Sequence, residues 1–168
     1  GRSPWLERAR AIAIREDHQG RIWVATDGDG LLLLDAEHGL LHQFLNDPND
    51  STSLGSNTLY SLHIDQDGVA WIGTANAGLD RVADMTAEPP AMYFENLSQA
   101  DGLPNNVING IQPDGTGALW LPSNNGLIRF DPKTKSIRTF HASHGAQAGE
   151  YTAGAFFRSA SGRLLFAG

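Results

Sequence analysis

The sequence contains no cysteine, so disulfide bonds and thiolate metal sites are excluded. No apolar run approaches the ~18 residues of a membrane span, and residues 1–5 lack the apolar region of a signal peptide. Lys and Arg are few and unclustered, and the net charge is −7, which argues against a phosphate-binding surface. We therefore expect no membrane insertion by this segment, no nucleic-acid partner and no cofactor.

Glycine, by contrast, is abundant and recurs in a repeated phrase. Gly-x-x-Trp occurs at Gly20–Trp23, Gly68–Trp71 and Gly117–Trp120, and Gly162–Leu165 is a degenerate copy with leucine in place of tryptophan. The copies are about 45–49 residues apart. A period of roughly 40–50 residues is typical of propellers, solenoids and repeat arrays.

Each repeat unit divides into short apolar segments separated by glycine with Asp or Asn. Segments such as Ile22–Val24 and Leu119–Leu121 are too short for helices and are apolar on both faces, as in strands buried on two sides. Four such strands per unit predict an all-β fold of antiparallel β-propeller blades; a flat solenoid is the alternative. We expect one domain over residues 1–168, a partial or half propeller of about three and a half blades, with units near 10–45, 58–96, 106–141 and an incomplete unit at 151–168.

An open arc of blades would leave an apolar face at each end, and faces of that size indicate a missing partner. We therefore expect self-association into a homodimer that completes a ring, or the remainder of a longer propeller. Seven blades from two half-rings is the simplest arrangement.

Aspartates near the turns suggest a calcium loop but fit it poorly. Asp27 with Asp29, and Asp65 with Asp67, precede glycine as in D-x-[DN]-x-[DN]-G, yet no Glu follows Asp27 or Asp65 at the twelfth position. Capping of hairpin turns is the favoured interpretation. The His141-x-x-His144 pair has no converging acid except Glu150, so we predict no metal site.

The tryptophans at Trp23, Trp71 and Trp120 could be sugar-stacking platforms, but their fixed place within apolar strands favours packing between blades. Ligand contacts are more plausible in the long, Asn-rich connections, because binding residues concentrate in loops carried by a rigid scaffold. The weak candidates are Asn57, Asn105, Asn106 and Trp5. Asn57 and Asn106 occupy matching positions, which favours a structural hydrogen bond for each.

The chain resembles the two-component regulator propeller repeat family across nearly its whole length. The resemblance is carried by Asp50–Asn57, Asp65–Thr74 and Gly78–Val82 in the second unit, and by Gly102–Val107 and Asn125–Thr134 in the third. Departures are Ala25 and Pro122 at usual glycine positions, and a longer segment over Asp84–Pro90.

This resemblance implies the C-terminal half of a periplasmic propeller in a hybrid two-component histidine kinase or a diguanylate cyclase, with an immunoglobulin-like domain, a membrane span and the output domain beyond it. It implies a sensor that perceives a glycan or small molecule and is not itself an enzyme. Two alternatives stay open. One is a propeller enzyme of the streptogramin-lyase type, for which His63 and Glu150 are the only plausible catalytic pair. The other is a structural propeller that recruits a protein partner.

Overall fold

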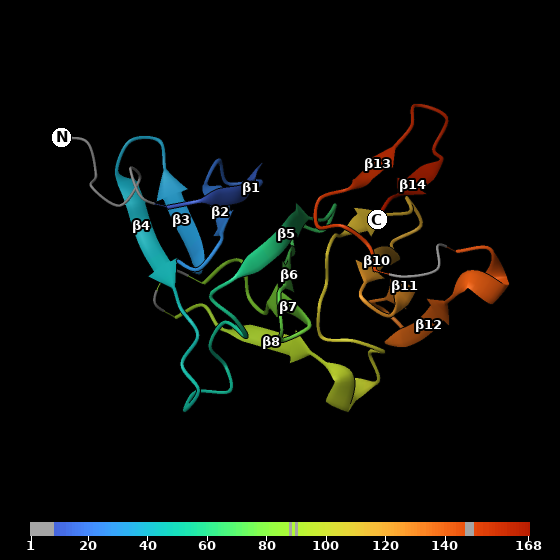
Figure 1. Cartoon of the computed structure of the whole chain (residues 1–168). Helices are drawn as coiled ribbons and strands as arrows, with labels where there is room; N and C mark the ends of the chain where they lie inside the picture. The colour runs from blue at the N-terminus through green and yellow to red at the C-terminus, as the bar shows by residue number, and fades with distance from the viewer. Residues whose placement is uncertain (1–8, 88, 90, 147–149) are drawn as a thin grey trace.

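The computed structural model describes residues 9–87, 89, 91–146 and 150–168. It confirms the all-β propeller fold: three four-stranded antiparallel sheets and one two-stranded sheet lie beside one another along the chain (Figure 1). Within each sheet, sequential strands are neighbours. The strands are β1 (Ala11–Glu16), β2 (Ile22–Thr26), β3 (Leu31–Asp35) and β4 (Gly39–Phe44); β5 (Leu59–Ile64), β6 (Ala70–Thr74), β7 (Leu79–Val82) and β8 (Phe94–Leu97); β9 (Gln112–Pro113), β10 (Leu119–Ser123), β11 (Gly126–Asp131) and β12 (Ser136–Phe140); and β13 (Phe156–Arg158) with β14 (Leu164–Phe166).

Single-turn 3-10 helices occur in the two connections that lead out of the second and third sheets. These are η1 (Gln99–Asp101) and η2 (Ala142–His144). We refer to the four sheets in chain order as blades 1 to 4. In Figure 1, blade 1 is blue to cyan, blade 2 green to yellow-green, blade 3 yellow to orange, and blade 4 red.

A glycine stands at the start of the third strand of each complete blade, directly before β3 and β7 and as the first residue of β11, because two backbone segments approach closely there. Gly78 has a φ of 95°, and a Cβ on it would lie 2.1 Å from the carbonyl oxygen of Leu97. Gly30 has the same environment, 2.2 Å from the oxygen of Phe44. The turn that precedes Gly78 is closed by Thr74, whose hydroxyl donates 2.8 Å to the Gly78 carbonyl. Only glycine tolerates both the left-handed backbone and the contact.

Aspartates in the first turn of blades 1 and 2 fix the repeated tryptophans. Asp65 Oδ2 accepts from Trp71 Nε1 at 2.8 Å, and its Oδ1 accepts from the backbone N–H of Val69 at 2.8 Å. Asp17 accepts from Trp23 Nε1 at the same distance. The capping role predicted for Asp65 is therefore confirmed, and one carboxylate orients both the turn and the adjacent indole.

The repeated tryptophans pack toward the following blade. Trp23 lies in a core shared by blades 1 and 2 with Leu31, Leu62 and Ile72 among others, and Trp71 lies in a second core shared by blades 2 and 3. Both rings are buried, as the packing interpretation predicted, whereas Trp120 in blade 3 is half-buried.

The innermost strand of blade 3 is shorter than the six-residue strands β1 and β5 at the same place in blades 1 and 2. Only Gln112–Pro113 forms β9, with a single bridge between Ile108 and Ser123 above it. Pro122 is the cause, because it has no N–H to donate to a neighbouring strand. In the incomplete unit expected over residues 151–168, the first strand begins only at Phe156, since Gly154 turns the chain with a φ of 75°.

Candidate functional site

The asparagines proposed as ligand contacts join neighbouring blades. Asn57 Oδ1 accepts from the backbone N–H of Asn46 at 2.7 Å, while its carbonyl accepts from the N–H groups of Gly28 and Gly30 at 3.1 and 2.9 Å. It therefore ties the connection that enters blade 2 to a turn of blade 1. The structural hydrogen bond expected for this residue is present.

Asn106 repeats this arrangement between blades 2 and 3. Its Oδ1 accepts from the N–H of Gln99 at 2.7 Å and its carbonyl accepts from Gly78 at 2.8 Å. The neighbouring Asn105 accepts from the N–H of Val107 at 2.7 Å. The structure thus places the candidates at two separate blade junctions, with their side-chain oxygens bound to backbone. Trp5 lies outside the described residues.

A buried carboxylate that the sequence reasoning missed lies beside the first of these junctions. Asp80 on β7 is fully buried, and its oxygens accept from the N–H of Gly55 and from Asn96 Nδ2, each at 2.8 Å. Burial raises the pKa of Asp80 to about 6 against the lowering effect of these two bonds. Blades 1 and 3 carry Leu32 and Ile128 at the equivalent position, so the repeat alignment could have revealed it.

A second feature missed from the sequence is a cleft of about 260 Å³ between blades 2 and 3. Arg81 on β7 pairs with Glu95 on β8 at 2.8 Å, and its guanidinium lies 6.0 Å from the centre of the Trp71 ring. The hydrogen bond from Arg81 lowers the pKa of Glu95. The lining residues are Trp71, Leu79, Arg81, Glu95, Asn96, Leu97, Asp101, Phe130, Pro132 and Lys135.

The cleft carries charged and amide groups above the largely buried rings of Trp71 and Phe130, a composition suited to holding a small polar ligand. At the junction of blades 1 and 2, Met85 and Ala87 from the long connection before β8 pack against the core. In blade 3 the corresponding turn, which contains Pro132 and Lys135, is short and leaves the cleft open. The sequence indicated this cleft through the connection between the third and fourth strands, which is long in blade 2 and short in blade 3.

The histidines hold structural positions. His144 Nδ1 accepts from the backbone N–H of His141 at 3.2 Å, and the two rings are 6.5 Å apart. His63 lies on β5 in blade 2, where burial lowers its pKa, whereas Glu150 lies in the connection that leads to blade 4. Across the described residues, no three His, Asp or Glu side chains gather as ligands of a metal ion.

Comparison with known proteins identifies the repeat. Residues 7–28 and 53–76 match the family described as two component regulator propeller. These repeats belong to the two-component regulator propeller family. Histidine kinase P4 of Formosa agariphila is 30% identical over 180 aligned residues that cover 81% of this chain. The chain spans only 13% of the length of that kinase.

Solved structures share the fold of this regulator propeller. The extracellular domain of a proposed hybrid two-component system from B. thetaiotaomicron superposes with a TM-score of 0.79 at 23% identity, over 94% of this chain and 20% of that one. A second such domain from B. thetaiotaomicron gives 0.75 at 24%, over 94% and 22%. A catalytically inactive virginiamycin B lyase from Staphylococcus aureus, bound to quinupristin, gives 0.65 at 16%, over 95% and 49%. In the described part of the chain, no helix is long and apolar enough to cross a bilayer.

Proposed function

We propose that this regulator propeller is a ligand-recognition segment of an extracytoplasmic bacterial sensor. The segment is not itself catalytic and lies in the periplasm, as part of a membrane receptor. It passes its signal to an output domain of the histidine kinase or diguanylate cyclase type. The observation that carries the proposal is the joint match to regulator propeller repeats and to a histidine kinase. The shared fold of extracellular two-component domains supports it.

The ligand is a glycan or another small polar molecule, and the cleft between blades 2 and 3 is the place where its contacts are best supported. Arg81, Glu95 and Asn96 supply donors and acceptors there, above the largely buried rings of Trp71 and Phe130. Because the cleft is built from two blades, an occupant would bias how they pack. A signal follows only if the ligand binds one packing arrangement more tightly than another.

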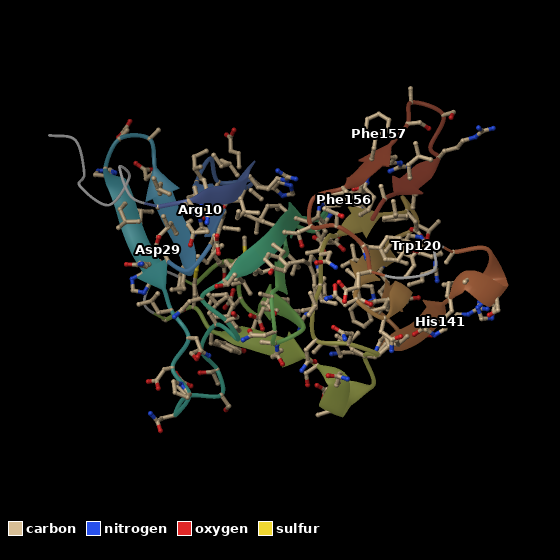
Figure 2. All side chains as sticks on the ribbon, viewed as in Figure 1. Arg10, Asp29, Trp120, His141, Phe156 and Phe157 are labelled. Carbon is tan, nitrogen blue, oxygen red and sulfur yellow. The ribbon has the colours of Figure 1, made fainter. Side chains whose placement is uncertain are left out.

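The apolar faces at the two ends of the arc are covered by further blades, either from a second copy or from a longer propeller. Ile14 on blade 1 is 55% exposed, whereas its repeat equivalent Leu62 on blade 2 is 2% exposed beneath blade 1. At the other end Phe157 is 61% exposed (Figure 2). Sedimentation over a range of concentrations tests self-association: a monomer at every concentration refutes the homodimer.

Thermal-shift screening with a panel of neutral and acidic oligosaccharides tests recognition. A ligand at ~100 times its Kd adds about 2.7 kcal/mol to the free energy of unfolding, which raises Tm by roughly 5–10 °C for a chain of this size. The variant Arg81→Gln should abolish the shift. Arg129→Gln is the matched control, because Arg129 is the equivalent residue of blade 3 and binds Asp114 outside the cleft.

Two results would contradict the proposal. A panel without any shift removes the support for glycan recognition, and a shift that Arg81→Gln leaves unchanged removes the cleft as its site. Chemical turnover of a bound ligand, followed by mass spectrometry, would overturn the non-catalytic assignment. Such turnover would revive the lyase-type interpretation with His63 and Glu150.

A further inference from the structure

Among the described residues that line the cleft between blades 2 and 3, Lys135 is the cation that has no acidic partner. Arg81 is paired with Glu95, whose Oε2 accepts from the Nε and Nη2 atoms of Arg81 at 2.8 Å each. The other acid of the lining is Asp101, whose Oδ2 accepts from the backbone N–H and the hydroxyl of Ser98, both at 2.9 Å. Both acids are therefore engaged by other donors, and the ammonium group of Lys135 is available to a molecule in the cleft.

Lys135 ends the turn between β11 and β12 in a backbone conformation that favours glycine. Its φ is 59°, and among the described residues it is the one non-glycine residue with a left-handed backbone. The corresponding turn of blade 1 has Gly39 at this position, with a φ of 77°. Both turns begin with an aspartate, Asp35 or Asp131, whose Oδ1 accepts from the backbone N–H groups two and three residues later. Because a left-handed backbone is strained for a residue with a Cβ, lysine does not serve the turn itself, and what it adds is an ammonium group at the cleft.

Two basic side chains reach the cleft from different blades, Arg81 from β7 of blade 2 and Lys135 from the β11–β12 turn of blade 3. The hydrogen bond from Arg81 lowers the pKa of Glu95, and the charge of Lys135 lowers it further. Since Glu95 engages Nε and Nη2 of Arg81, the Nη1 atom can still donate to an occupant. Hydrogen bonds from such cations to an ionised oxygen are about twice as strong as those between neutral groups. The cleft therefore favours an anionic occupant.

We propose that Lys135 is a specificity-determining residue that selects an acidic sugar, one that carries a carboxylate or sulfate group, for the cleft between blades 2 and 3. Its ammonium group binds the anionic oxygen atoms of the sugar, as a compact charge on a long side chain can do without a fixed geometry. This inference rests on the proposed function, since it narrows the ligand of the same cleft from small polar molecules in general to anionic ones.

The lysine content of the chain allows a direct test. Lys133 and Lys135 are the only lysines in the sequence, and Lys133 does not line the cleft. Reductive methylation of the full chain with ¹³C-formaldehyde therefore gives an NMR signal for each of the two lysines besides that of the N-terminal amine, and Lys133→Gln assigns them. Methylation keeps the positive charge of both side chains. Lys133 thus serves as an internal control two residues from the site.

Two pairs of probes separate charge from sugar shape. Digalacturonic acid and its methyl ester form the carboxylate pair, and galactose 6-sulfate and galactose form the sulfate pair. At least one acidic probe should shift the Lys135 signal in a saturable manner and leave the Lys133 signal in place, whereas its neutral counterpart should move neither signal. The pair that responds identifies the anionic group. High salt should weaken the response, because it screens the attraction between exposed charges.

The variant Lys135→Gly separates the role of the side chain from that of the turn. It should raise the urea midpoint, because glycine adopts the left-handed backbone without strain. It should also weaken binding of the acidic probe about ten-fold or more, because a hydrogen bond from a charged group is lost. Lys133→Gln is the matched control and should leave the affinity unchanged.

A Lys135 signal that stays in place with both acidic probes, or that moves together with the Lys133 signal, would overturn the inference. An unchanged affinity in Lys135→Gly would do the same. A neutral oligosaccharide whose thermal shift is lost in Arg81→Gln and kept in Lys135→Gly would also overturn it, while the proposed function would stand. Failure of the proposed function has a different signature, because no oligosaccharide then raises the Tm of the wild type, and the inference falls with it.

Discussion

The buried carboxyl of Asp80 should contribute a loss of stability as the pH rises from acid to neutral. Asp80 is fully buried and has no cation among its hydrogen-bond partners, which are the N–H of Gly55 and the Asn96 amide. A Cβ on Gly55 would lie 3.0 Å from both carboxylate oxygens. The site therefore leaves no room for a side chain at Gly55 and supplies only neutral donors to the charge.

The sign follows from proton binding. The pKa of Asp80 is about 6 in the folded chain against 3.8 for an ordinary aspartate, so between these values the folded state binds more protons than the unfolded state. The contribution of Asp80 to the free energy of unfolding therefore decreases with rising pH in this window. Two pKa units at 1.36 kcal/mol each give about 3 kcal/mol, present below pH ~4 and lost above pH ~6.

Urea unfolding of the wild type and Asp80→Asn at pH 4 and pH 7.5 measures this quantity. The stability of Asp80→Asn relative to wild type should rise by about 3 kcal/mol between the two pH values, because the amide does not titrate. Asp84→Asn is the control of opposite sign, since hydrogen bonds from Thr86 lower the pKa of exposed Asp84. Equal pH slopes for wild type and Asp80→Asn would refute the reasoning.

Three further predictions test the repeat architecture through the free energy of unfolding. Asp65→Ala should cost about 1–3 kcal/mol and shift indole emission, because buried donors lose their acceptor. Gly78→Ala should lower the free energy of unfolding by more than the ~1 kcal/mol of an ordinary glycine replacement, because the φ of Gly78 is 95° and the new Cβ would meet the Leu97 oxygen. An unchanged urea midpoint would contradict this prediction. Leu62→Ala should lower the free energy of unfolding by about 2–5 kcal/mol, whereas Ile14→Ala at the equivalent exposed position should lower it by only about 0.5 kcal/mol. Equal losses for the two variants would mean that the outer face of blade 1 is covered in solution.

The repeat made the fold predictable from sequence, because the same glycine and tryptophan positions recur with the same physical role. Gly78 and Gly30 directly precede equivalent strands, and Asp65 and Asp17 bind equivalent indoles. Strand ends were less predictable where one unit departs from the pattern. Pro122 shortens the inner strand of blade 3 by removing an N–H that the other blades possess, a consequence visible only once its strand partner is known.

The candidate site was less predictable because the residues that repeat are the ones the scaffold uses. Asn57 and Asn106 occupy matching positions in the repeat because the side-chain oxygen of each accepts a hydrogen bond from a backbone N–H. The features that distinguish one blade from another involve residues that depart from the repeat pattern. Asp80 replaces an aliphatic residue in only one blade, and the cleft beside Arg81 depends on one short connection. In this repeat protein, deviation between equivalent positions therefore indicates candidate binding residues, whereas recurrence indicates residues that the scaffold uses.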